Sequence, residues 1–166
     1  MATGQSTKLT GAVGEFLVAA ELCRRDLLAT PFAGNVPHYD IIASGIKGGH
    51  ILVQVKAINE GTWQFDISKY LDVRMHEDGK RQVLGKLQPE PFPGLVCVLV
   101  LLKGTGKDRF FVLEWKELRK ILAAGYRKYL LRHNFVRPSA HRSFHTALKI
   151  ADVDQFENRW DKILPR

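Results

Sequence analysis

Apolar residues recur along the chain with two different periods, and each period predicts a different kind of element. In residues 10–25 they recur at steps of three and four, which predicts an amphipathic helix. The expected buried stripe of this helix consists of Val13, Phe16, Leu17, Ala20 and Cys23. Residues 115–131 have the same spacing and predict a second helix with a basic outer face. A third helix is expected to follow a cap at Asp152.

Segments rich in β-branched and apolar residues predict the strands. Residues 38–44 and 50–57 flank a glycine-containing turn, so they predict a hairpin. Residues 95–102 are continuously apolar, as in a strand covered on both faces, and a strand at 109–113 follows after a Gly-Thr-Gly turn. Short strands are also expected at 63–67 and 144–150. The order α-β-β-β-β-β-α-β-α predicts an α/β fold, with a mixed central sheet flanked by helices, in a single domain spanning residues 1–166.

Composition narrows the class of protein. The chain has 166 residues, of which 45% are hydrophobic and 25% charged, and this excludes disorder, collagen and a disulfide-rich miniprotein. The longest apolar run is well short of the ~20 residues that a membrane helix needs, and the first residues lack an apolar signal core. We therefore expect a soluble, cytoplasmic protein with no membrane partner. Cys23 and Cys97 lie among apolar residues, so both are predicted to be reduced and in the core.

The net charge of +8 is concentrated in the second part of the chain. Residues 1–102 hold 10 Lys and Arg against 10 Asp and Glu, whereas residues 103–166 hold 15 against 7. Such a segment favours a polyanionic partner, although a basic stretch is also compatible with a solvated helix face. The predicted nucleic-acid-binding residues are Lys116, Arg119, Lys120, Arg127, Lys128, Arg132, Arg137 and Arg142.

Four polar residues form a candidate constellation on the first helix and the predicted hairpin. Gln54 and Lys56 project from one face of a strand, Asp40 lies early in the preceding strand, and Glu15 lies on the helix before them. Phosphodiester hydrolysis uses these group types: oxygen ligands hold Mg²⁺, and an ammonium positions water and offsets charge in the transition state. A lysine on an otherwise apolar strand is costly to bury unless it is paired or functional.

This arrangement resembles the PD-(D/E)XK nuclease superfamily. The resemblance is carried by Glu15 within a Gly-Ala-Val-Gly-Glu segment, by Tyr39-Asp40, and by Gln54-Val-Lys56 after a step of 14 residues. It covers residues 7–70 best and implies the fold of restriction endonucleases and archaeal-type Holliday junction resolvases. With Arg159-Trp160-Asp161 near the end, the chain is similar to small, uncharacterised bacterial members of that superfamily.

The resemblance implies a role for each matching position. Asp40 would be the central metal-binding carboxylate, Lys56 the catalytic lysine and Glu15 the helix-borne acid that assists the metal, with the backbone carbonyl of Val55 as a further ligand. Gln54 stands where the family more often has Glu, so the site loses one negative charge while keeping an oxygen ligand. The implied cofactor is Mg²⁺ or Mn²⁺. The implied activity is that of an endonuclease acting on DNA rather than RNA, and a homodimer would suit cleavage of two strands.

Other interpretations of the same residues stay open. Asp40 and Lys56 are also compatible with a plain cross-strand ion pair. The chain would then be a degenerate member of the fold that binds nucleic acid without cutting it, or a protein-interaction module with an acidic partner. Trp63 and Phe65 are interpreted as core residues rather than as rings that stack on nucleotides.

Overall fold

The computed structural model describes residues 4–32, 37–45 and 48–163. The chain forms two compact units. The first unit comprises Met1–Trp63, Pro91–Trp115 and Lys149–Arg166, and the second comprises Gln64–Glu90 and Lys116–Leu148. All four residues of the candidate constellation lie in the first unit, and the basic segment lies in the second.

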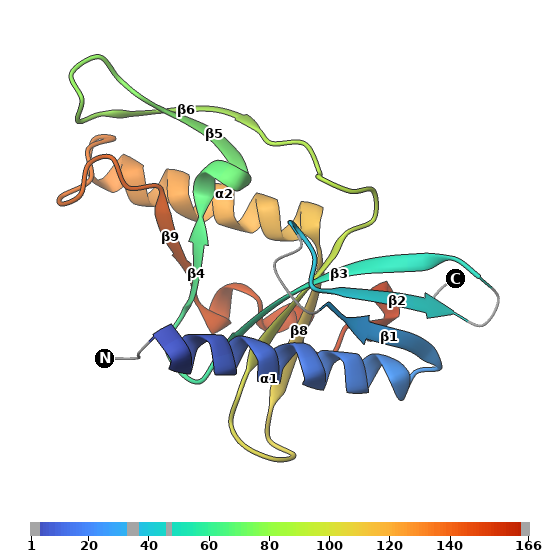
Figure 1. The fold of residues 1–166 in the computed structure, drawn as a ribbon. Helices are drawn as coiled ribbons and strands as arrows, with labels where there is room; N and C mark the ends of the chain where they lie inside the picture. Colours follow the sequence, from blue (N-terminus) through green and yellow to red (C-terminus); the bar gives the residue numbers. More distant parts are fainter. Residues whose placement is uncertain (1–3, 33–36, 46–47, 164–166) are drawn as a thin grey trace. The chain divides into compact units, whose positions relative to one another are not determined.

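A five-stranded sheet organises the first unit (Figure 1). Its strand order is β1-β2-β3-β7-β8, in which β3 and β7 are parallel and every other neighbouring pair is antiparallel. The strands are β1 (Leu27–Pro31), β2 (Ile41–Gly45), β3 (His50–Ile58), β7 (Val96–Leu101) and β8 (Arg109–Glu114). The predicted α/β class with a mixed central sheet is confirmed, as are the β2–β3 hairpin and the interior strand β7, all of whose residues are buried. The sequence pattern missed β1.

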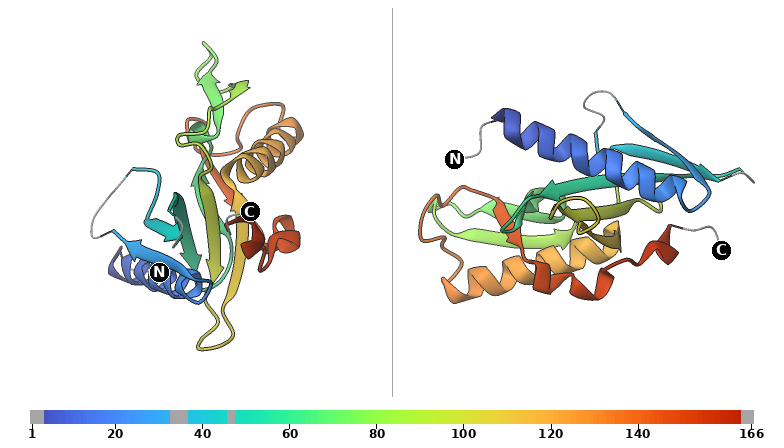
Figure 2. Two further views of the ribbon diagram at one scale, coloured as in Figure 1. Left: turned by 90° about the vertical axis from the view of Figure 1, so that its right-hand side faces the viewer. Right: turned by 90° about the horizontal axis from the view of Figure 1, so that it is seen from below.

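Helix α1 (Gly4–Cys23) packs against β1, β2 and β3 (Figure 2). The predicted stripe does not make this contact. The buried residues are Gly14, Val18, Ala19 and Leu22, whereas Val13 and Phe16 are 46% and 68% exposed. The reason is the close approach at Gly14, where an added Cβ would lie 2.5 Å from the Cβ of Ala57. Only a helix face made of small residues fits this close to β3. The more apolar stripe that contains Val13 and Phe16 therefore faces away from the sheet. The prediction that Cys23 lies in the core is therefore wrong, whereas Cys97 is buried as expected.

The predicted third helix is replaced by three short 3₁₀ turns, η2 (Ile150–Asp152), η3 (Asp154–Phe156) and η4 (Trp160–Lys162). Between the last two, Asn158 has a φ of 55° and its N–H donates to the carbonyl of Phe110 on β8. A positive φ ends any right-handed helix, so this tether breaks the predicted element. Trp160 is nevertheless buried and joins the core of the first unit.

The second unit combines α2 (Trp115–Arg132), which confirms the predicted second helix, with short antiparallel pairs. Strand β5 (Leu71–Met75) pairs with β6 (Gln82–Leu87), and β4 (Trp63–Asp66) pairs with the predicted edge strand β9 (His145–Leu148). A further turn, η1 (Ile67–Lys69), follows β4. The sequence pattern missed β5 and β6. Trp63 and Phe65 are both buried, which confirms them as core residues.

Candidate functional site

Asp40 is fixed by hydrogen bonds at the start of β2. Its N–H donates to the carbonyl of Val53 (2.9 Å), and its own carbonyl accepts the N–H of Phe32 (3.0 Å). The side chain makes a third bond, because Oδ2 accepts the backbone N–H of Val55 at 2.7 Å. The carboxylate therefore serves as an acceptor for β3 just before β2 begins. This locks its position on the strand that carries Gln54 and Lys56.

Lys56 lies one residue beyond the Asp40 contact on β3. Its ammonium is near enough to Asp40 to favour the ionised form of that carboxyl and so to lower its pKa. The backbone of Lys56 is held separately, since its carbonyl accepts the indole N–H of Trp63 at 3.0 Å. Trp63 is 1% exposed, so a rigid core residue supports the strand at this lysine.

Glu15 reaches the site from α1. Its neighbour Gly14 makes the close contact with Ala57, which sets the position of this helix turn on β3. Burial raises the pKa of the Glu15 carboxyl, and the negative charge of Asp40 raises it further. The Glu15 carboxyl is therefore within electrostatic range of Asp40.

Burial also raises the pKa of Asp40, against the opposing effects of the Val55 N–H and the Lys56 charge. Both carboxyl groups have raised pKa values, and the charge of Asp40 contributes to the raised pKa of Glu15. Negative charge is therefore costly at this site. A bound cation would relieve that cost. Glu15 and Lys56 therefore both lie within electrostatic range of Asp40.

Gln54 has a different neighbour. It lies opposite Cys97 in the β3–β7 register, and its Oε1 accepts a weak bond from the thiol at 3.9 Å. The amide oxygen is therefore directed at β7, whereas Asp40 contacts β3 from β2.

The donor set suits one class of metal. Among the described residues, no group of three or more His, Cys, Asp and Glu is placed to hold an ion. What the site offers is two carboxylates and, from β3, carbonyl and amide oxygens. Mg²⁺ is commonly bound through one or two carboxylates with water completing its shell, so the residues present fit a hard divalent cation.

The eight predicted nucleic-acid-binding residues, all in the second unit, divide into two groups. Three have local partners: Lys116 pairs with Glu90 at 3.2 Å, Arg119 donates to the carbonyl of Gln88, and Arg137 donates to the carbonyl of His145 at 2.9 Å. The other five have exposed side chains, and within the described ranges they form no ion pair. They are Lys120, Arg127, Lys128, Arg132 and Arg142.

A buried polar network orders the loop that carries two of these arginines. Gln82 is 1% exposed, and its amide donates to the carbonyls of His141 (2.7 Å) and Ser143 (3.1 Å). Its oxygen accepts the hydroxyl of Tyr126 at 2.6 Å, and Arg137 donates to the same hydroxyl at 3.3 Å. Because the Gln82 amide and the Tyr126 hydroxyl are both paired, the loop is pinned to α2 and β6. Arg137 therefore has a structural role that the sequence did not reveal.

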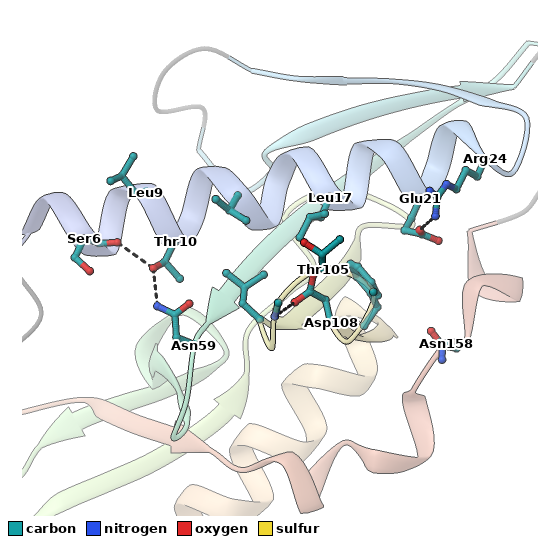
Figure 3. Close-up of a pocket in the computed structure, with 15 residues that line it drawn as sticks. Ser6, Leu9, Thr10, Leu17, Glu21, Arg24, Asn59, Thr105, Asp108 and Asn158 are labelled. Atoms are coloured by element: carbon teal, nitrogen blue, oxygen red, sulfur yellow. Dashed lines mark hydrogen bonds and ion pairs between the residues drawn. The ribbon is translucent and has the colours of Figure 1, made fainter.

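A groove of about 1150 Å³ runs along α1, away from the predicted constellation (Figure 3). At one end the side chain of Asn59 donates to Thr10 (3.1 Å), and at the other Arg24 pairs with Glu21 (2.8 Å). Of the described residues that line it, none is Glu15, Asp40, Gln54 or Lys56. These two polar pairs lie at opposite ends of the groove and do not converge on a common point.

Sequence reasoning missed an aromatic cluster beside Asp40. The rings of Phe32 and Phe92 both contact the ring of Tyr39, with centroids 5.5 Å apart in each case. Phe92 is distant from Asp40 in sequence, so only the fold brings it here. The Pro-Phe-Pro-Gly stretch that contains it was a visible signal of a fixed turn.

Comparisons with known proteins show a likeness in structure. No family model and no curated protein matches the chain. Among solved structures, the chain is similar to a bacterial homing endonuclease, I-Ssp6803I, at 17% sequence identity and a TM-score of 0.49, over 96% of this chain and 93% of that one. At this TM-score the likeness carries no argument about activity. No helix in the described ranges has the length and apolar character needed to cross a membrane.

Proposed function

We propose that this chain is a metal-dependent nucleic-acid phosphodiesterase of the PD-(D/E)XK, restriction-endonuclease-like type, with DNA as its expected substrate. The observation that carries the proposal is the position of Asp40, whose carboxylate is bonded to the Val55 N–H on β3 with Lys56 and Glu15 in electrostatic reach. A cross-strand ion pair alone does not account for this arrangement, because it would not need a second partly buried acid.

The residues have distinct roles in this proposal. Asp40 and Glu15 would hold Mg²⁺ or Mn²⁺, with the carbonyl of Val55 as a further oxygen ligand. When bound, the cation polarises the scissile phosphate and lowers the pKa of a water molecule. The ammonium of Lys56 positions that water and offsets charge on the phosphate. The fixed N–H bond of Asp40 keeps its carboxylate in place, so little reorganisation is needed.

Substrate affinity is proposed to come from the second unit. Exposed Arg and Lys side chains bind phosphates without regard to sequence, releasing counterions as they do so. The five exposed residues of the basic segment supply this contact. Arg119, Arg137 and Lys116 contribute by holding the surface in shape or by exchanging a local partner for a phosphate.

A cleavage assay tests the proposal. End-labelled single-stranded, duplex and branched DNA would be incubated with the wild type in Mg²⁺, in Mn²⁺ and in EDTA. We expect metal-dependent cutting by the wild type, none by Asp40→Asn, and normal cutting by Glu60→Gln, which removes an exposed carboxylate of the same unit. Gln54→Glu is expected to cut at lower metal concentration, because a charged oxygen replaces a neutral one at a hard cation.

The contact between Gln54 and Cys97 favours a second candidate function, a nucleic-acid-binding member of the fold that does not cut. An amide held by a thiol is a weaker ligand than the usual carboxylate. Intact binding together with no cutting of any substrate, by the wild type and by Gln54→Glu alike, would reject the enzyme and leave the binding protein.

A further inference from the structure

Four aromatic side chains gather beside Asp40 in the first unit. Tyr39 meets Phe32 and Phe92 edge to face, at interplanar angles of 73° and 84°, and the imidazole of His38 lies 6.1 Å from the ring of Phe92. These rings come from the ends of β1 and β2 and from the turn before β7. They form one patch, the aromatic cluster, defined by Phe32, His38, Tyr39 and Phe92.

This aromatic cluster is not part of the buried core. Phe32, Tyr39 and Phe92 are only partly buried and His38 is exposed, whereas the core of the first unit is built from other side chains. Large rings are normally buried, because they contribute most when removed from water. Several partly exposed rings on one patch leave apolar surface in contact with water. A ligand with a flat apolar face would bury that surface.

Backbone connections and hydrogen bonds fix the position of the aromatic cluster relative to Asp40. Tyr39 directly precedes Asp40, and the N–H of Phe32 donates to the carbonyl of Asp40 at 3.0 Å. Phe92 is held by a tight turn in which the N–H of Leu95 donates to its carbonyl at 3.2 Å, with Gly94 at a φ of 74° that favours glycine. His38 itself has a φ of 76°, a strained value for a residue with a side chain.

We infer that the aromatic cluster stacks on an unpaired nucleobase beside the phosphate that Asp40 addresses. The substrate class is therefore nucleic acid with a single-stranded, frayed or flipped nucleotide at the cleavage point, rather than an intact duplex. An aromatic ring can stack on a base only when one face of the base is uncovered, and in a continuous duplex both faces are covered by neighbours. The position relative to the phosphate rests on the proposed function, but the stacking does not need cleavage.

The test uses the full chain carrying Asp40→Asn, in EDTA, so that binding is measured without cutting. The probes are a single-stranded oligonucleotide with one 2-aminopurine and the same sequence as an intact duplex. We expect tighter binding of the single strand and quenching of its 2-aminopurine. Phe92→Leu should remove the quenching and weaken single-strand binding by roughly 5- to 150-fold, the effect of losing one stacked base, while leaving duplex affinity unchanged.

Two further variants separate stacking from folding. Phe92→Trp keeps an aromatic face and should restore single-strand binding, which a loss of packing would not allow. Phe16→Leu removes a more exposed ring from α1 and should change neither affinity. Equal affinity of the parent for both probes, an equal loss on both with Phe92→Leu, or no quenching would overturn the inference. Because cutting is absent throughout, these outcomes do not depend on whether the wild type is a nuclease.

Discussion

The first unit carries 12 Lys and Arg residues against 11 Asp and Glu, whereas the second carries 13 against 6. The two units also differ in the kind of polar group that is withdrawn from solvent. In the first unit, Glu15 and Asp40 are carboxyl groups whose pKa values are raised by burial. In the second, the buried polar group is the neutral amide of Gln82, and the cations of α2 are largely at the surface.

This difference separates two kinds of functional group. A carboxyl group that is costly to ionise in the folded protein lowers the free energy of unfolding. Such a group is typical of a site that binds a cation or performs chemistry. Exposed cations cost little and act together on a polyanion at long range. If the proposal is correct, substitutions in the first unit change the rate of cleavage, and substitutions in the second change affinity and its dependence on salt.

The largest expected effect is on catalysis. Lys56→Ala should lower the cleavage rate by about 10²- to 10⁴-fold, the usual contribution of a positioned acid–base group, while DNA affinity stays within a factor of about two. Lys103→Ala, which removes an exposed lysine of the same unit, is the control and should leave the rate unchanged. A parallel loss of rate and affinity in Lys56→Ala would mean that this lysine only binds phosphate.

The second effect is on affinity. Replacing Arg127, Lys128 and Arg132 together with Ala should reduce the slope of log affinity against log salt by up to about three, since each neutralised phosphate contributes about 0.9 for duplex DNA. Anisotropy titrations at several salt concentrations measure this slope. The matched triple Lys8, Lys103 and Lys107→Ala removes the same charge from the first unit. If both triples change the slope equally, the division between the units is wrong.

A third prediction concerns the packing that places Glu15. Gly14→Ala introduces a Cβ 2.5 Å from that of Ala57, so it should destabilise the protein by roughly 1–3 kcal/mol and slow cleavage by shifting α1. Gly11→Ala lies on the same helix with nothing within 4 Å, and should stabilise by roughly 0.5–1 kcal/mol. Denaturant unfolding of the two variants gives the comparison. A stable Gly14→Ala variant with normal cleavage would show that this contact does not position Glu15.

The smallest expected effect is on stability at Asp40, and its sign depends on pH. Because the pKa of Asp40 is raised in the folded state, its protonated form favours folding, and that contribution is lost as pH rises through the folded pKa. Asp40→Asn should match the wild type near pH 3 and be more stable at pH 7, because the amide oxygen still accepts the Val55 N–H. Asp40→Ala leaves that N–H without its acceptor and should be about 1–3 kcal/mol less stable than Asp40→Asn.

Thermal or denaturant unfolding from pH 3 to pH 7 measures these differences. A wild type that is more stable than Asp40→Asn at pH 7 would show that the ionised carboxylate stabilises the fold. The site would then be an ordinary structural ion pair.

The pattern of apolar and polar residues predicts those elements whose structure depends mainly on their own residues. The continuously apolar β7, the β2–β3 hairpin and α2 are each specified by residues within the element. The orientation of α1 is not, because the contact between Gly14 and Ala57 excludes a bulkier but more apolar stripe. The prediction of a C-terminal helix was wrong for a similar reason. The hydrogen bond from Asn158 to Phe110, which interrupts it, joins residues far apart in the sequence. The alternation of Leu71, Val73 and Met75 with charged residues was a signal for β5 that went unused.

The candidate site shows the same limit. The sequence predicts that Asp40 and Lys56 are close, because one hairpin joins their strands. The thiol contact of Gln54 and the rings of Phe32 and Phe92 depend instead on the neighbouring strands β1 and β7. No periodicity within one segment contains that information.

The central claim is that chemistry belongs to Asp40 in the first unit and affinity to the basic surface of the second. Single-turnover cleavage with protein in excess tests it most directly, because saturation removes the effect of affinity from the rate. We predict that the Arg127, Lys128 and Arg132 triple variant reaches the wild-type rate at a higher protein concentration, and that Asp40→Asn falls at least about 100-fold at any concentration. Wild-type cutting by Asp40→Asn, or a saturated rate in the triple variant as low as that of Asp40→Asn, would contradict the account.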